Sequence, residues 1–400
     1  VSSNTIQSSR ESYGGGTCSF SLNDSSIVEI FDTDFSGNEI NGFSLFSYSY
    51  GGAVSSNGDY SKIKIENSTF NQNNISSVND SKGGAISSNA QNNSSFTSIN
   101  NCLINENSAF SNDFSKGGGL YNSSLNGNSV VEINNNCIIS NNSSKSTSTF
   151  SYGGGIYSFS NNSNSKINLN DSKVISNFSI SNYHSSGGGI FSSSNYSSIV
   201  INNSSILSNE IFVDSSNVFS NNGHSEGGGL SSYGEYGSSV EIHNSSISSN
   251  KVFMHADNRD ISGGGLSSRS SSNNKLIISN SDVSENSILN TGHSGASQGG
   301  GIYHFSSGDS SITLISNSTI SNNQCYSTND YATGAGLSNL LYSDYNNQST
   351  KLYNLFLTNT TITGNNSSSL RSAGGGIYIR TQGIPNTNVE VINSTIYDNR

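Results

Sequence analysis

A triplet of small residues, Gly-Gly-Gly or a close variant, returns at near-regular intervals along the whole chain. Its copies begin at Gly14, Gly51, Gly83, Gly117, Gly153, Gly187, Gly227, Gly263, Gly299, Gly334 and Gly374. Successive copies lie 32 to 40 residues apart, and an aliphatic residue follows at once in ten of the eleven. A period of this length indicates a repeat architecture in which each unit buries its apolar face by stacking on its neighbours.

A second block lies between the triplets and carries two polar columns around a short apolar segment, as in Ile242-His-Asn244-Ser-Ser-Ile247-Ser-Ser-Asn250. The first column is Asn or Asp in every unit. The closing column is Asn in every unit, and we predict that it forms a buried ladder in which each side-chain amide hydrogen-bonds the next. The predicted members are Asn38, Asn73, Asn107, Asn141, Asn177, Asn209, Asn250, Asn286, Asn323, Asn365 and Asn399.

The apolar pattern inside each unit is that of short strands. Alternation of period two with β-branched residues, as at Val240 and Ile242, favours strands, and Ser, Asn and Gly are poor in helix interiors. The chain is therefore predicted to be all-β, a parallel β-helix (β-solenoid) of about eleven coils with three short strands per coil. Residues 1–13 are read as an inter-coil segment or incomplete coil, and residues 14–400 as one solenoid domain of repeats of about 36 residues. The segment from each closing Asn to the next glycine is read as a variable loop that faces partners.

Composition excludes several functions. The net charge is −11, which disfavours nucleic acid as a partner, and no apolar run is long enough to span a membrane. Four cysteines, Cys18, Cys102, Cys137 and Cys325, are too few for a disulfide scaffold, and they contain no CxxC pair. Cys102 and Cys137 are placed at neighbouring, non-equivalent positions, so a bridge between them requires a backbone turn.

The motifs resemble those of a known family. Gly83-Gly-Ala-Ile86 and Phe70-Asn-Gln-Asn73 resemble the GGA[ILV] and FxxN motifs of the polymorphic outer-membrane protein repeats. The commoner form, Gly-Gly-Gly-Ile-Tyr, is similar to repeats of secreted β-helix proteins. The resemblance implies a right-handed parallel β-helix at the cell surface, often adhesive, with no catalytic residues. The chain departs from the family because Ile or Val mostly replaces Phe and no barrel region is present.

Catalysis on such a fold, by a polysaccharide lyase or hydrolase, would need clustered carboxylates. Asp32 and Asp34 form one local pair, Asp171 has no acidic neighbour in its column, and Glu29, Glu132 and Glu241 share a position only in non-adjacent units. We therefore expect no enzyme, no catalytic residues, no metal and no cofactor, and keep a polysaccharide-active enzyme as the alternative.

Two further patterns stay open. His184 and His224 each lie three residues before a triplet in adjacent coils, where they would either bind a metal or remain solvated loop residues. Tyr157, Tyr303, Tyr378 and Phe191 follow the first aliphatic residue, where alternation points them outward. They would either bind sugar or a neighbouring fibril, or pack under the loops.

The expected setting is extracellular or the cell surface, with the chain as an adhesin, a matrix protein or a filament subunit. The candidate N-glycosylation sites are Asn74, Asn79, Asn142, Asn177, Asn347 and Asn366. Joining Arg400 to Val1 of a second copy would leave 14 residues between Asn399 and the next glycine, within the range of 8 to 17 found inside the chain. Either the chain is a segment of a longer solenoid, or the expected partners are a second copy, end to end, with glycans or other surface proteins.

Overall fold

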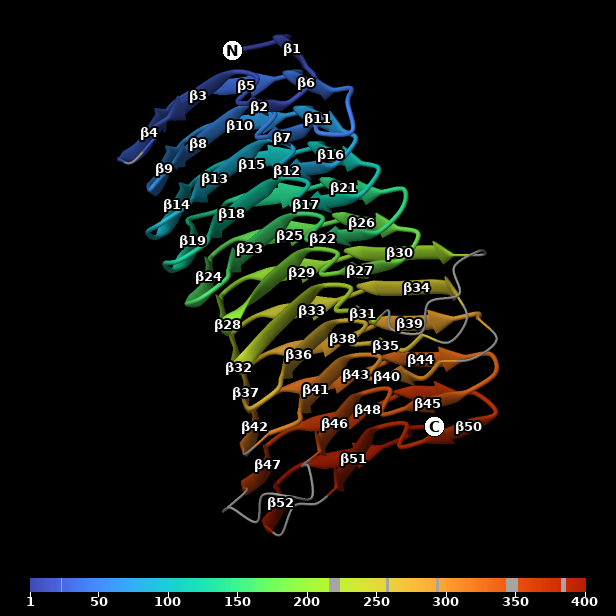
Figure 1. Cartoon of the computed structure of the whole chain (residues 1–400). Helices are drawn as coiled ribbons and strands as arrows, with labels where there is room; N and C mark the ends of the chain where they lie inside the picture. Colours follow the sequence, from blue (N-terminus) through green and yellow to red (C-terminus); the bar gives the residue numbers. More distant parts are fainter. Residues whose placement is uncertain are drawn as a thin grey trace.

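The computed structural model describes residues 1–22, 24–215, 224–256, 259–292, 295–308, 310–342, 352–382 and 386–400. Every regular element in these residues is a β-strand, and every pairing between strands is parallel. The turns stack into one column from the N-terminus to the C-terminus (Figure 1). The prediction of an all-β parallel β-solenoid is therefore confirmed.

The strands of the described residues form four sheets, three of which contain eleven strands each. Sheet A consists of β5 (Asp34–Ser36), β10 (Thr69–Asn71), β15 (Leu103–Asn105), β20 (Ile138–Ser140), β25 (Lys173–Ile175), β29 (Ser205–Leu207), β33 (Ser246–Ser248), β38 (Asp282–Ser284), β43 (Thr319–Ser321), β48 (Thr361–Thr363) and β53 (Thr395–Tyr397). Sheet B consists of β1 (Thr5–Ser8), β6 (Glu39–Gly42), β11 (Asn74–Ser77), β16 (Ser108–Ser111), β21 (Ser143–Ser146), β26 (Phe178–Ser181), β30 (Glu210–Ser215), β34 (Lys251–Ala256), β39 (Ser287–Asn290), β44 (Gln324–Ser327) and β49 (Asn366–Ser368). Sheet C consists of β2 (Glu11–Tyr13), β7 (Tyr48–Tyr50), β12 (Asp80–Lys82), β17 (Phe114–Lys116), β22 (Phe150–Tyr152), β27 (His184–Ser186), β31 (Ser225–Glu226), β35 (Ile261–Ser262), β40 (Ser297–Gln298), β45 (Tyr331–Thr333) and β50 (Arg371–Ala373).

Sheet D has twenty strands and folds into two layers. The first layer follows the glycine triplets and consists of β3 (Thr17–Phe20), β8 (Val54–Gly58), β13 (Ile86–Ala90), β18 (Leu120–Ser124), β23 (Ile156–Ser160), β36 (Leu266–Ser270), β41 (Ile302–Ser306), β46 (Leu337–Tyr342) and β51 (Ile377–Gln382). The second layer consists of β4 (Ser25–Phe31), β9 (Tyr60–Glu66), β14 (Ser95–Asn100), β19 (Ser129–Asn134), β24 (Asn164–Asn170), β37 (Asn273–Ser279), β42 (Ser310–Ser316), β47 (Leu352–Thr358) and β52 (Asn386–Ile392). The long strands β28 (Ile190–Asn202) and β32 (Leu230–His243) run through both layers.

In the described residues nine turns thus have five strands, and the two turns that contain β28 and β32 have four, so the prediction of three was wrong. The segment between the ladder Asn and the next glycine, expected to be a loop, begins with a strand of sheet B and ends with a strand of sheet C. In the turn that starts at Asn73, these are β11 and β12. The segment was read as a loop because many of its inward positions are serine, which hides the alternation that marks a strand. Residues 1–13 contribute β1 and β2, which pair with β6 and β7.

Three corners per turn require a left-handed backbone, and they explain much of the repeat. The first glycine of each triplet has a positive φ, as at Gly153 (φ 59°). The first polar column has a positive φ, as at Asn67 (φ 48°), because Asn and Asp tolerate this conformation better than other non-glycine residues. The residue before the ladder Asn forms the third corner, as at Gln72 (φ 55°).

The middle glycine of the triplet is required by close approach between turns. A Cβ atom added at Gly84 would lie 2.0 Å from the carbonyl oxygen of Gly118, and one added at Gly118 would lie 2.3 Å from that of Gly154. Such contacts are too short for a side chain at these two positions, so glycine lets successive triplets approach closely at this bend, and Ala335 takes the equivalent place in the Gly334 triplet.

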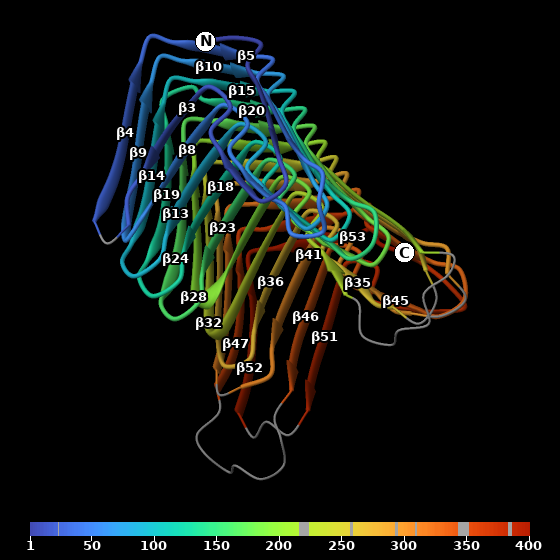
Figure 2. The ribbon, with the colours of Figure 1, turned by 45° about the horizontal axis from the view of Figure 1, so that its top comes forward.

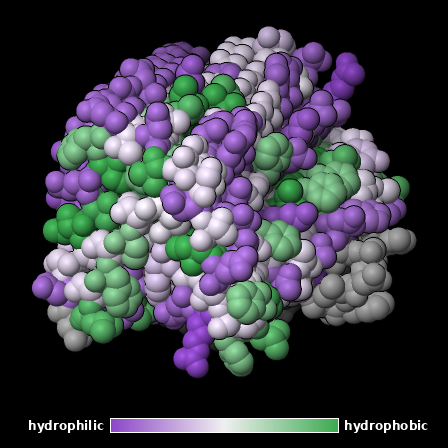
Figure 3. Space-filling model, turned by 90° about the horizontal axis from the view of Figure 1, so that it is seen from above, coloured by the Kyte–Doolittle hydropathy of each residue, from purple (hydrophilic) through white to green (hydrophobic). Residues whose placement is uncertain are grey.

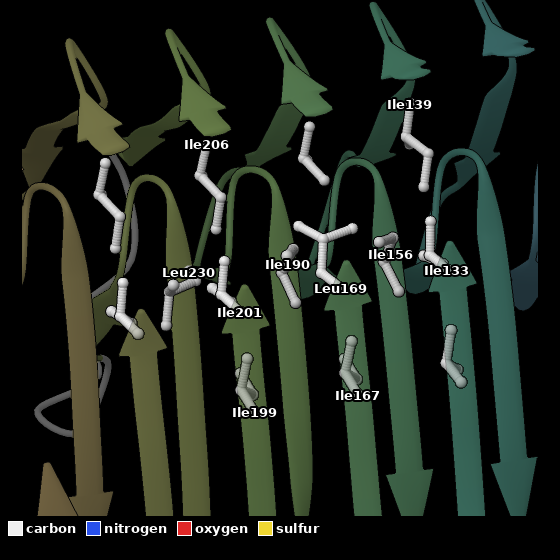
Figure 4. Packing of buried hydrophobic residues seen from close by; sticks show 14 of the residues in the cluster. Ile133, Ile139, Ile156, Ile167, Leu169, Ile190, Ile199, Ile201, Ile206 and Leu230 are labelled. Atoms are coloured by element: carbon white, nitrogen blue, oxygen red, sulfur yellow. The ribbon is translucent and has the colours of Figure 1, made fainter. Parts of the chain in front are cut away.

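The apolar core is a narrow aliphatic column between sheet A and the root of sheet D. The residues directly after the nine interior triplets are fully buried, and they stack on one another from turn to turn, as Ile156, Ile190 and Leu230 do (Figure 4). Ile139 and Ile206 of sheet A close the column from the other side (Figure 4). Each turn adds only a few aliphatic side chains, so burial depends on the neighbouring turns.

Two arms extend from this column (Figure 2). One arm is formed by the two layers of sheet D, and the other by sheets B and C. The D arm is filled largely with hydroxyl groups: Ser61, Ser88 and Ser95 are fully buried and hydrogen-bond one another at 2.8 and 2.9 Å. Seen from above the first turn, hydrophobic residues lie scattered among hydrophilic ones (Figure 3).

Candidate functional site

The closing Asn column forms a continuous hydrogen-bonded ladder. Each side-chain carbonyl accepts two bonds from the preceding Asn, one from its backbone N–H and one from its side-chain amide. Between Asn73 and Asn107 these are 2.9 and 3.0 Å. The second amide proton of Asn107 goes to the carbonyl oxygen of Phe70 at 2.9 Å. Every side-chain polar group in the interior of the ladder therefore has a partner, which makes its burial tolerable.

The structure places ten of the eleven predicted ladder residues in this column, and Asn142 rather than Asn141 occupies the remaining rung. Asn107 donates to Asn142, and Asn142 donates to Asn177, each side chain at 2.9 Å. The shift arises because the corner of this turn holds an extra residue, with both Asn135 and Asn136 at positive φ. Asn4 is a further rung that the sequence analysis missed, and it donates to Asn38 at 2.8 Å.

The same extra residue brings the two central cysteines into equivalent positions. Cys102 N donates to the Sγ atom of Cys137 at 3.3 Å, as Cys137 N donates to the hydroxyl of Ser172 at 3.2 Å. The placement of the two cysteines at non-equivalent positions was therefore wrong. Both are buried free thiols that take the place of serine in a column of backbone-bound hydroxyls.

The ladder removes two of the candidate glycosylation sites from solvent. Asn142 and Asn177 are fully buried rungs, so the prediction that they carry glycans is wrong for the folded chain. Asn74 and Asn366 are exposed on sheet B, and Asn79 is half-buried with its amide bonded to the hydroxyl of Tyr48 at 2.8 Å. Asn347 lies outside the described residues.

The predicted aromatic row leaves the core, and two of its members, Tyr157 and Phe191, line a cleft. Tyr157, Tyr303 and Phe191 are 6, 7 and 8% exposed, and Tyr378 is half-buried. Tyr157 stacks on Tyr121 and on Phe191, with ring centroids 5.3 and 5.6 Å apart. Of the two alternatives, packing against neighbouring side chains fits these rings better than exposure to a sugar or a fibril.

The cleft lies between the outer faces of sheet C and the first layer of sheet D, and we call it the aromatic cleft. It is a hollow of about 420 Å³. Sheet C contributes β22, β27 and β31, and sheet D contributes β23, β28, β32 and β36. The described residues that line it are Tyr152, Tyr157, Phe159, His184, Ser186, Phe191, Ser193, His224, Glu226, Tyr233 and Arg269.

An ion pair between a buried glutamate and a half-buried arginine lines the aromatic cleft. Arg269 donates to Glu226 at 2.6 Å, and Ser267 donates its hydroxyl to the other carboxylate oxygen at 3.2 Å. Burial alone would raise the pKa of the Glu226 carboxyl, but the charge and hydrogen bond of Arg269, together with the two neighbouring histidines, outweigh it, so the pKa is lowered. Glu226 is therefore an ionised carboxylate at neutral pH, and each of its oxygens accepts one hydrogen bond and can accept another.

The two predicted histidines lie at the edge of the same cleft. The backbone N–H of His224 donates to His184 Nδ1 at 3.2 Å, so the two histidines are in contact across turns, and both are half-buried instead of fully solvated. Burial lowers the pKa of His184 to about 4, which keeps its ring neutral at neutral pH. Among the described residues, no three His, Cys, Asp or Glu side chains lie close enough to hold a metal ion.

The carboxylates singled out from the sequence lie elsewhere. Asp32, Asp34 and Asp171 are exposed near the corners of sheet A, and Glu29, Glu132 and Glu241 lie on the outer face of the second layer of sheet D. Glu241 accepts a hydrogen bond from Lys275 at 2.7 Å, which lowers the pKa of its carboxyl. Glu226 does not stand out in the sequence, because it has no neighbouring carboxylate and pairs instead with an arginine of the next turn.

Comparison with known proteins adds no relative. The chain matches no protein-family model, no curated protein and no solved structure. The resemblance to polymorphic outer-membrane protein repeats thus has no match behind it. In the part of the chain that the structure describes, no helix is long and apolar enough to cross a membrane. The structure shows that the chain is a parallel β-solenoid.

Proposed function

We propose that the chain is a structural, non-catalytic β-solenoid that acts outside the cell or at its surface. The observation that carries this proposal is the uniformity of the stack. All four sheets run through the column, and the Asn ladder links every turn to the next. Such a stack gains its stability from neighbouring turns and yields an extended rod, which suits a matrix or filament component. The repeat resemblance supports display at the cell surface.

We also propose that copies associate end to end. The register of strand pairing changes little from turn to turn. The unpaired backbone groups of a terminal turn could therefore pair with the strands of a terminal turn in a second copy. A second copy could therefore continue the ladders by the same hydrogen bonds, in a heterologous contact that does not close.

The alternative, a polysaccharide lyase or hydrolase, has less support. Among the described residues lining the aromatic cleft, Glu226 is the one carboxylate, and it is ion-paired with a lowered pKa. A glycosidase needs two carboxyl groups, one of which must be protonated to act as the acid. The cleft therefore favours binding over hydrolysis.

Electron microscopy combined with sedimentation, at several protein concentrations, tests the proposed association. We expect long filaments of uniform width. The variant Val391→Lys serves as a control, because Val391 is 48% exposed on β52 while its register partner Leu357 is buried. A charge there should block stacking on that edge and leave single folded rods. Single rods of the parent chain at every concentration would overturn the proposal.

A further inference from the structure

The aromatic cleft lies where a run of stacked aromatic residues ends. Tyr121, Tyr157 and Phe191 hold the position after the first aliphatic residue in three successive turns. In the next two turns that position is Ser231 and then Ser267, and the aromatic side chain returns at Tyr303. Two small residues between large ones leave the hollow open, and Glu226 and Arg269 reach into it from its two walls.

We propose that the aromatic cleft binds a neutral carbohydrate chain. Aromatic rings with accessible faces stack on the apolar C–H faces of sugar rings, and here they come from both walls of one hollow. Tyr152, Phe159 and Tyr233 keep part of their surface exposed at the cleft, so their rings can be contacted by a ligand.

The polar groups of the cleft suit sugar hydroxyls. Glu226 is fixed by Arg269 and by the hydroxyl of Ser267, so its orientation does not depend on a ligand. Arg269 is itself held over the ring of Phe305, with 5.2 Å between its guanidinium carbon and the ring centroid. A rigid pair of one acceptor and one donor group matches neighbouring hydroxyls, and a charged partner strengthens each hydrogen bond.

The charge balance separates a neutral sugar from other ligands of an aromatic hollow. An aromatic cage that binds a quaternary ammonium ion uses an unpaired negative charge or electron-rich faces alone. Here the carboxylate of Glu226 is neutralised by Arg269, and His184 carries no charge at neutral pH. The lining therefore offers no net charge from these groups to either a cation or an anionic sugar.

The arrangement along the column indicates a chain of sugars instead of a single one. The cleft is lined by four successive turns. They contribute, in order, Tyr152, then His184 and Phe191, then Tyr233, and then Arg269. Successive turns are about 4.8 Å apart, close to the length of one sugar residue in an extended glycan. Each sugar would thus meet the side chains of a new turn. This inference adds a ligand to the proposed scaffold and does not depend on end-to-end association.

Calorimetric titration of the full chain tests the proposal, with neutral hexasaccharides cut from cellulose, laminarin, xylan, mannan and chitin as probes. We expect at least one to bind, and Tyr233→Ala to weaken that binding about tenfold by removing a stacking face. Tyr236→Ala is the matched control, because Tyr236 lies on the same strand, β32, but outside the cleft and is 49% exposed. The Tyr236→Ala variant should bind the hexasaccharide with the same affinity as the parent chain.

A second variant tests the polar pair without leaving a buried charge. Glu226→Gln combined with Arg269→Gln removes both charges together, and thermal melting checks that it folds. We expect a loss of binding of about tenfold. The proposal is overturned if none of the five hexasaccharides binds, if Tyr233→Ala binds as the parent does, or if tetramethylammonium is the only probe that binds.

Discussion

The arm formed by sheets B and C is filled in two different ways along one column. The inward positions of successive sheet B strands read Ser144, Ser179, Ile211, Val252 and Ile288, all in register. The hydroxyls of the first two join a chain of hydrogen bonds with sheet C, whereas the last three belong to an aliphatic cluster. The backbone geometry is shared, so neither filler is required by the fold.

The difference shows what the column does require. A serine chain satisfies itself because each hydroxyl donates to one neighbour and accepts from another, as Ser185, Ser179 and Ser151 do at 2.6 and 3.0 Å. An aliphatic column has no polar group to satisfy and gains from burial instead. What should destabilise the fold is a mismatch, a polar group among aliphatic ones or a break in a polar chain.

The largest loss of stability is expected when a polar side chain replaces an aliphatic one in the aliphatic turns. Ile211→Ser should lower the free energy of unfolding by about 5 kcal/mol, because it removes a buried aliphatic side chain and leaves a hydroxyl without partners. Glu210→Ser, on the outward side of the same strand, is the control and should change little. Equilibrium denaturation measures both. A small effect of Ile211→Ser would mean that a single serine is tolerated at this position even when its neighbours are aliphatic.

A break in the Asn ladder is expected to cost slightly less. Asn142→Ala leaves the backbone N–H and the side-chain amide of Asn107 without their shared acceptor, at about 4 kcal/mol for two buried donors. Asn141→Gly is the matched control, since Asn141 is exposed and has a positive φ that glycine adopts freely. If Asn141→Gly proved the more damaging of the two, the assignment of the rung would be wrong.

Histidine in a hydroxyl column should make stability depend on pH. His304 occupies the column of Ser268 in the D arm and bonds Thr313 at 2.7 Å, and burial lowers its pKa to about 3. Unfolded His has a pKa near 6.5, so the unfolded state binds the proton first and stability falls as pH drops from about 6.5 towards 3. At pH 5 the loss should be about 2 kcal/mol.

The variant His304→Ser should remove this part of the pH dependence, whatever it does to stability at pH 7.5. His255→Ser is the control, because His255 is exposed on β34. Urea denaturation at both pH values gives the comparison. An unchanged pH slope in His304→Ser would contradict the assignment.

The smallest effects compare two serines on one strand, β26. Ser179→Ala should cost about 1 kcal/mol, because Ser185 loses its acceptor. Ser181 is buried with no hydrogen-bond partner for its hydroxyl, so Ser181→Ala should be neutral or slightly stabilising. Equal losses in thermal melting would show that the hydroxyl chain contributes nothing beyond packing.

The sequence predicts the parts of this fold that repeat without exception. The glycine triplets and the Asn column could be recognised because a left-handed corner and a buried amide ladder each accept very few residue types. The strands of sheets B and C were not predicted, because their inward positions are serine in some turns and aliphatic in others. The one-residue insertion at Asn136 moved both the ladder rung and Cys137, and a residue count alone cannot locate such an insertion.

The aromatic cleft could be predicted only in part. The histidines and the aromatic column were visible as repeated positions. Glu226 and Arg269 were not, because they are far apart in the sequence, on different sheets, and neither belongs to a repeated column of like residues. Their pairing depends on how sheet C faces sheet D, which the repeat pattern does not specify.

The central claim is that polar side chains stack in register through the solenoid and satisfy one another there. Hydrogen exchange of the Asn side-chain amides, followed by nuclear magnetic resonance, tests it most directly. The amides of interior rungs such as Asn177 and Asn250 should exchange slowly, and those of the exposed corner residues Asn67 and Asn244 should exchange at once. Rapid exchange at the predicted rungs would contradict the ladder and, with it, this account of how the turns are held together.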